Sequence, residues 1–129
     1  MDVSHRKTEA QPGTVESFGE FDLQEEACNL VRRAAEGGGE AVSLVQEADL
    51  QVTLRRLDAG SCIPWHEAPG RITVQTIAGH IRMHAAGREF DLPQGHLLTL
   101  GPSVRHDVQA VVDSAFLITR AAPPGGKKR

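Results

Sequence analysis

Apolar residues near the start of the chain recur at helical spacing. Asp22 precedes them as a candidate N-cap, with Glu25 three residues on as its reciprocal partner. A run of glycines, Gly37 to Gly39, ends the pattern. We therefore expect one amphipathic helix over residues 23–36, with an apolar face formed by Leu23, Ala27, Leu30, Val31 and Ala34.

After the glycines the apolar period falls from near four to two. In residues 50–57, for example, Leu50, Val52 and Leu54 alternate with polar residues. Many short strands separated by Gly and Pro turns are typical of a β-sandwich or barrel. We expect strands at residues 41–47, 50–57, 71–78, 80–85, 88–92, 96–100, 105–112 and 115–120.

Glycines and histidines in the second half of the chain recur in two ordered frames. In the first, Gly60 is followed by five residues and His66, and Gly79 closes the frame. In the second, Gly95 is followed by five residues and a Gly-Pro-Ser segment, and His106 comes next in register. Both frames resemble the two motifs of the cupins, most closely those of small single-domain members. The resemblance implies a mainly β fold: a double-stranded β-helix, or jelly-roll barrel, with one N-terminal helix.

The resemblance also bears on metal binding, because cupin motifs supply three histidines and one glutamate as ligands. His66 and His106 match two of the histidines, whereas Ala68 stands at the place of the third and Ile72 at that of the glutamate. The ligand set is therefore degenerate. A divalent transition metal (Zn, Ni, Mn or Fe) would have to bind His66, His106 and a non-standard ligand.

Two neighbours of His66 bear on that further ligand. Cys62 shares the strand parity of His66, so it is expected to face inwards, as a soft metal ligand or as a small buried hydrophobe. Glu67 has the opposite parity and is expected to point outwards.

A small barrel turns one face of each strand towards its interior. Strand alternation then predicts a pocket that suits a small, mostly apolar organic ligand. We expect it to be lined by His66, His106, Ile72, Val74, Val108, Val112 and Phe116, with Trp65 beside His66 as a wall.

Five arginines fall on polar strand faces, and most of these five are expected to be solvated: Arg55, Arg56, Arg71, Arg82 and Arg88. An arginine that faced inwards would bind a carboxylate and change the functional interpretation. His80 and His84 alternate with apolar residues, so we expect them to face solvent or a partner chain.

Composition restricts the partners and the cellular location that we expect for the protein. The chain has 129 residues, a net charge of −3 and no basic stripe, which argues against a nucleic-acid partner. No 18-residue apolar run or signal peptide is present, so no membrane segment is expected. Two distant cysteines indicate reduced thiols in the cytoplasm. We expect disordered tails at 1–17 and 121–129 around one domain at 18–120.

Three functions fit these features. The first is a small-molecule-binding module with its ligand near His66 and His106. The second is a cupin-type metalloenzyme, an oxygenase or isomerase, and the third is a structural or sensory protein. A homodimer is expected because strand edges and residues such as Leu44 and Val45 need cover.

Overall fold

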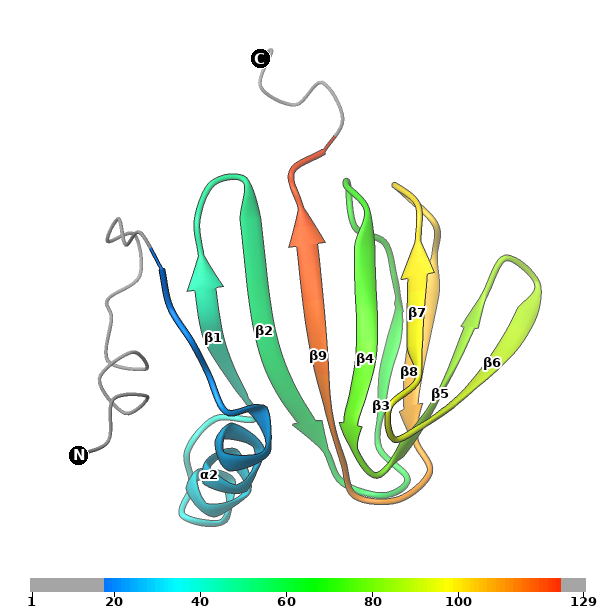
Figure 1. The fold of residues 1–129 in the computed structure, drawn as a ribbon. Helices are drawn as coiled ribbons and strands as arrows, with labels where there is room; N and C mark the ends of the chain where they lie inside the picture. Colours follow the sequence, from blue (N-terminus) through cyan, green and yellow to red (C-terminus); the bar gives the residue numbers. More distant parts are fainter. Residues whose placement is uncertain (1–17, 124–129) are drawn as a thin grey trace.

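The computed structural model describes residues 18–123. It contains one helix, α2 (Leu23–Ala35), followed by strands only (Figure 1). The strands are β1 (Ala41–Gln46), β2 (Leu50–Leu57), β3 (Cys62–His66), β4 (Ile72–Ala78), β5 (His80–Ala85), β6 (Arg88–Pro93), β7 (Leu97–Leu100), β8 (His106–Ala110) and β9 (Ser114–Ala121).

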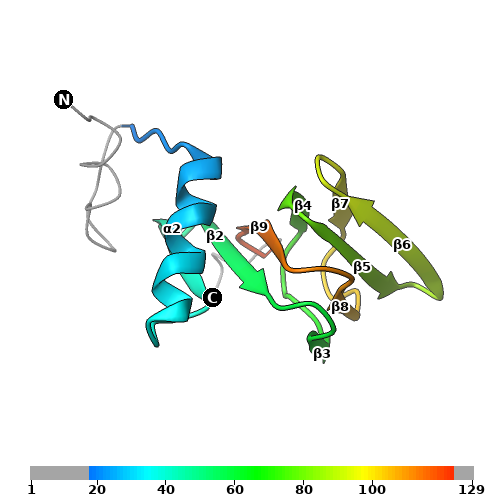
Figure 2. The same cartoon turned by 90° about the horizontal axis from the view of Figure 1, so that it is seen from below.

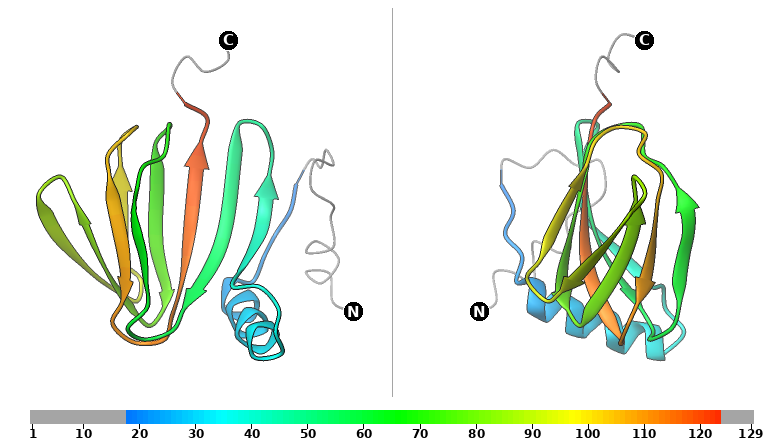
Figure 3. Two further views of the ribbon diagram at one scale, coloured as in Figure 1. Left: turned by 180° about the vertical axis from the view of Figure 1, so that it is seen from behind. Right: turned by 90° about the vertical axis from the view of Figure 1, so that its right-hand side faces the viewer.

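The strands form two antiparallel sheets that face each other, as the right-hand view of Figure 3 shows. One sheet has the order β1-β2-β9-β4-β7 and the other the order β3-β8-β5-β6. The chain passes repeatedly from one sheet to the other, for example through the single residue Gly79 between β4 and β5 and through residues 111–113 between β8 and β9, and this arrangement is a jelly-roll. The mainly β prediction with one N-terminal helix is therefore confirmed.

Local chemistry sets both ends of the helix. The Asp22 carboxylate accepts a hydrogen bond of 3.1 Å from the backbone N–H of Glu25, as an N-cap does. At the other end Gly37 adopts φ +89° and Gly38 donates its N–H to the carbonyl of Arg33. Val31, which was expected on the buried face, is half exposed. Glu26 is buried instead, so the buried stripe is rotated by part of a turn.

The helix covers the outer face of the five-stranded sheet. Ala27 and Leu30 pack with Leu54, Ile77 and Ala115 in a small second core. Figure 2 shows α2 alongside β2, away from the sheet that contains β3 and β8. The apolar face of β2 therefore turns towards the helix, and its opposite face turns towards the barrel interior.

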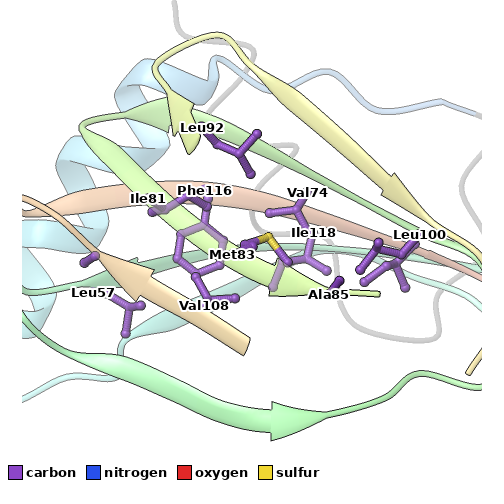
Figure 4. Close-up of a cluster of buried hydrophobic side chains, with 12 residues drawn as sticks. Leu57, Val74, Ile81, Met83, Ala85, Leu92, Leu100, Val108, Phe116 and Ile118 are labelled. Atoms are coloured by element: carbon purple, nitrogen blue, oxygen red, sulfur yellow. The ribbon is translucent and has the colours of Figure 1, made fainter. Parts of the chain in front are cut away.

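The main core lies between the two sheets, where Phe116, Met83 and Val108 meet (Figure 4). Phe116 and Met83 are fully buried. This cluster fills one part of the interior and leaves a cavity beside it. The cluster is formed by Leu57, Ile72, Val74, Ile81, Met83, Ala85, Leu92, Leu100, Val108, Ala110, Phe116 and Ile118.

The segment ends differ from expectation in a few places. β3 was not predicted as a strand, and β8 ends at Ala110 rather than at residue 112. β9 runs through Ala121, the first residue of the expected C-terminal tail. The expected N-terminal tail, 1–17, and residues 124–129 lie outside the described residues. Within 18–123, no helix combines the length and the apolar character that crossing a bilayer requires.

Candidate functional site

The two motif histidines meet inside the barrel. His66 ends β3 and His106 begins β8, and the two residues are direct partners in the sheet. Their ring centroids are 4.2 Å apart, with an interplanar angle of 64°. Residues forty positions apart in sequence therefore form one imidazole pair.

Both rings are held in the same way by the main chain. His66 Nδ1 lies 2.8 Å from the carbonyl oxygen of Pro64, and His106 Nδ1 lies 2.9 Å from that of Val104. Because a carbonyl oxygen only accepts, each Nδ1 carries the proton that it donates. In the neutral form each Nε2 then keeps a free lone pair, which can accept a hydrogen bond or bind a metal.

The charge state of His106 follows from its surroundings. Burial lowers its pKa below the usual value of 6.5, although the hydrogen bond to the Val104 carbonyl opposes this shift. Nearby charges at His66 and Arg120 lower the pKa further. His106 is therefore neutral at pH 7, and its Nε2 is an acceptor.

A cavity of about 240 Å³ adjoins the histidine pair. Of the residues expected to line it, His66, His106, Ile72, Val74, Val108 and Phe116 all do so. Ile63, Ala68, Pro69 and Ile118 add further apolar surface. The lining of the cavity is thus mostly apolar, and the two imidazoles are held in it by main-chain hydrogen bonds.

Cys62 lies away from this cavity because strand β3 contains an irregularity. The register of β3 against β8 shifts between Ile63 and His66, as in a β-bulge. Ile63 and His66 therefore both line the cavity although they are three residues apart. Cys62, which shares parity with His66 in a regular strand, is exposed as a free thiol. The expectation that it faces inwards is wrong.

Trp65 and Val112 also lie outside the cavity. Trp65 is half exposed on the outer side, with its ring centroid 6.3 Å from that of His84 and the Arg105 guanidinium 5.8 Å from its centroid. The bulge that turns His66 inwards leaves Trp65 outside. Val112 follows the end of β8 and is half exposed, so it does not continue that strand's inner face.

The cavity is also lined by three charged residues that were not predicted to line it: Arg55, Arg120 and Glu67. Arg55 was expected to be solvated, but Leu54 packs against the helix, so Arg55 faces inwards. Arg120 has the same strand parity as Phe116, a signal in the sequence that could have identified it. Glu67 is exposed, in agreement with its parity, and it also borders the cavity.

His80 and His84 lie on the outer face of the four-stranded sheet. His80 contacts Asp91 at 2.7 Å, and His84 contacts Asp107 at 2.9 Å. The hydrogen bond to Asp107 raises the pKa of His84 above 6.5 against an opposing effect of desolvation, and Glu89 adds to the rise. These histidines belong to a surface charge network and are separate from the cavity.

No family model matches this sequence, and no curated protein matches it. Solved structures do resemble it. A cupin superfamily protein from Desulfitobacterium hafniense DCB-2 aligns at a TM-score of 0.62 and 16% identity, over 64% of this chain and 75% of that one. A conserved Streptococcus pyogenes protein of unknown function aligns at 0.67 and 21% identity, over 89% and 96%.

A third structure is salicylate 1,2-dioxygenase from Pseudoaminobacter salicylatoxidans, solved as adducts with gentisate. It aligns at a TM-score of 0.73 and 17% identity over 92% of this chain. This chain has the cupin fold. The cupin barrel described above spans only 37% of the length of the dioxygenase, so the likeness concerns the fold.

The cupin fold implies a test of metal fit at the histidine pair. His66 and His106 supply two imidazoles, while Ala68 and Ile72 contribute only apolar surface to the cavity. Across residues 18–123, no group of three or more His, Cys, Asp or Glu side chains is placed to hold a metal ion. Catalytic zinc centres usually keep three protein ligands. The donor set of this cupin barrel therefore falls short of a resident metal centre.

Proposed function

We propose that this cupin barrel binds one small organic molecule in the cavity beside His66 and His106. The observation that supports the proposal is a largely apolar cavity with two main-chain-anchored imidazoles at its wall. Small-molecule sites combine apolar walls with a few fixed polar groups in this way.

The histidines determine which kind of polar group the ligand must carry. His106 is neutral at pH 7 and its Nδ1–H is already engaged with the Val104 carbonyl. Its Nε2 therefore accepts a hydrogen bond, and a ligand hydroxyl or N–H group supplies the matching donor.

The chain carries its own reporters for the experiment. It contains five isoleucines, of which Ile63, Ile72 and Ile118 line the cavity while Ile77 and Ile81 do not. A small-molecule library is screened by NMR on protein labelled at the isoleucine methyl groups. A ligand of the cavity shifts the first three methyl signals and leaves the other two nearly unchanged. Hits that shift only Ile77 or Ile81, or no hits at all, would count against the proposal.

The competing function is a metal-dependent oxygenase or isomerase. The two free Nε2 lone pairs favour it, but the described residues supply no further protein ligand. Metal content of the protein, purified without a His-tag column, separates the two functions.

A further inference from the structure

We propose that the ligand is a compact carboxylic acid with an apolar body, and that Arg55 and Arg120 bind its carboxylate. This inference rests on the proposed function, because it names the ligand class of the same cavity. The two arginines belong to neighbouring strands, β2 and β9, of the five-stranded sheet.

Arg55 faces the barrel interior with an unsatisfied donor. It pairs in register with Phe116, which is fully buried in the main core, so the two side chains share a face of the sheet. Its Nε atom is buried and has no hydrogen-bond partner. Buried donors in native proteins normally have partners. A ligand carboxylate in the cavity would supply the missing acceptor.

Arg120 approaches the cavity from further along β9. It pairs with Ile72 on one side and with Gln51 on the other, four residues beyond Phe116. That separation is roughly 13 Å between Cα atoms at about 3.3 Å per residue. The two long side chains therefore reach the same cavity from different levels of the sheet.

Arg56 and Arg82 share with Arg55 a buried Nε that has no hydrogen-bond partner, but their charges are neutralised by carboxylates. Arg56 forms ion pairs with Glu40 and Asp58, and Arg82 forms ion pairs with Glu89 and Asp91. Over the described part of the chain, neither Arg55 nor Arg120 lies within 4.0 Å of a carboxylate. Their charges are left without an internal counter-ion, which favours an anion as the partner.

The other residues that line the cavity indicate the charge, the apolar character and the size of the ligand. Among the described residues that line the cavity, Glu67 is the one acidic side chain. Arg55 and Arg120 together with Glu67 therefore leave a net charge of +1 before any histidine is counted. That balance fits a single carboxylate. The apolar side chains fit a hydrocarbon body, and about 240 Å³ is less than the roughly 300 Å³ at which sites for drug-sized ligands begin.

The experiment compares acids with neutral isosteres of the same shape. The acid 3-hydroxybenzoate is paired with 3-hydroxybenzamide, and 3-hydroxyisovalerate with its amide, so that every probe keeps a hydroxyl donor for His106 Nε2. Affinities are measured from the isoleucine methyl shifts. Each acid is expected to bind at least about tenfold more tightly than its amide, because a charged hydrogen bond is lost in the amide. The preference is expected to shrink at high salt.

Variants locate the carboxylate. Arg55→Met and Arg120→Met keep an apolar stem and remove the charge, and at least one should weaken acid binding about tenfold while leaving amide binding unchanged. Arg88→Met is the matched control, because Arg88 is exposed over the Phe90 ring, away from the cavity. Arg55→Gln and Arg120→Gln, which also remove the charge but keep a polar side chain, give the same comparison if a methionine variant does not fold.

The outcomes separate this inference from the proposed function. Amides that bind as tightly as acids, or arginine variants that all retain wild-type acid affinity, would overturn the carboxylate assignment. Shifts of the three cavity isoleucines by other compounds would still uphold the cavity as a binding site. If neither acids nor amides bind, the carboxylate assignment fails, whereas the binding function is judged by the library screen.

Discussion

His66 and His106 are direct partners across β3 and β8, and each donates its Nδ1–H to the carbonyl two residues before it. Their rings are therefore fixed to the backbone by identical local contacts.

The first prediction concerns metal. The wild-type protein should hold less than one equivalent of tightly bound metal, because Ala68 and Ile72 provide no donor atoms. The double change Ala68→His and Ile72→Glu should create a response to Zn²⁺, Ni²⁺ or Mn²⁺, seen as a rise in melting temperature on metal addition. Without metal it should cost several kcal/mol, since Ile72 is buried and a glutamate there must be desolvated.

A matched control for that change places the same residue types outside the cavity. Leu97→His with Val112→Glu alters two exposed positions and should give no metal response. Stoichiometric metal in the wild type would contradict the first part and would favour the metalloenzyme. A folded double mutant without a metal response would show that positions 66, 68, 72 and 106 do not converge.

The second prediction is a loss of stability on the acid side. The pKa of His106 is lowered in the folded protein, so below its usual value of 6.5 the unfolded chain takes up a proton that the folded protein resists. The free energy of unfolding should therefore fall as pH drops from 6.5 towards the folded pKa. His106→Asn, which keeps a donor for the Val104 carbonyl, should flatten this dependence in denaturant titrations.

His84 provides the opposite case within the same protein. Its pKa is raised, so its contribution to stability is present below pH 6.5 and is lost as pH rises through the folded value. His84→Asn should therefore remove a loss of stability that occurs as pH rises above 6.5, whereas His106→Asn removes a loss that occurs as pH falls below 6.5. Equal slopes for both variants would show that the two environments have been assigned wrongly.

The third prediction compares the same two histidines in binding. His106→Ala should weaken a cavity ligand by at least about tenfold, because it removes a buried acceptor. His84→Ala should leave affinity unchanged, since His84 lies in the surface network with Asp107 and Glu89. Methyl-detected titrations measure both. Equal losses would place the ligand elsewhere.

The fourth prediction tests a motif glycine. Gly79 has φ +87°, and a Cβ there would lie 2.8 Å from the Cα of Ser114. Gly87 has φ +73° but nothing within 4 Å of such a Cβ. Gly87→Ala should cost about 1–2 kcal/mol from the backbone alone, and Gly79→Ala clearly more. Chemical denaturation of both variants measures the difference, and equal costs would argue against close packing at Gly79.

The fifth prediction is a homodimer. Strand β1 forms an open edge of its sheet, and Val45 on it is only partly covered. Light scattering at high micromolar concentration should give about twice the monomer mass of 13.9 kDa. A mass of 13.9 kDa under those conditions would contradict the prediction.

The sequence predicted most of the elements because their signals are local. Asp22 and Gly37 bound the helix within one residue, and the change from helical to alternating spacing located most strands. The pairing of His66 with His106 followed from two motif frames.

It was harder to predict which face of each strand points into the barrel, because this depends on contacts between segments that are distant in sequence. Leu54 and Arg55 alternate regularly, but the alternation does not say which face meets the helix and which meets the cavity. The bulge in β3 inverts the expected side for Cys62 and has no clear signal in the residues around it. Arg55 was missed as a cavity residue for the first of these reasons, whereas the parity of Arg120 with Phe116 was a signal that could have been used.

The backbone anchors of the two imidazoles have an evolutionary consequence. The carbonyls that hold the two rings belong to the main chain of Pro64 and Val104, so these contacts do not depend on which side chains line the cavity. Substitutions at positions such as 55, 68, 72 and 120 can therefore change the shape and charge of the cavity while both imidazole rings keep their orientation. A lineage could exchange one ligand chemistry for another by altering lining residues one at a time, each intermediate retaining a folded barrel and an intact imidazole pair.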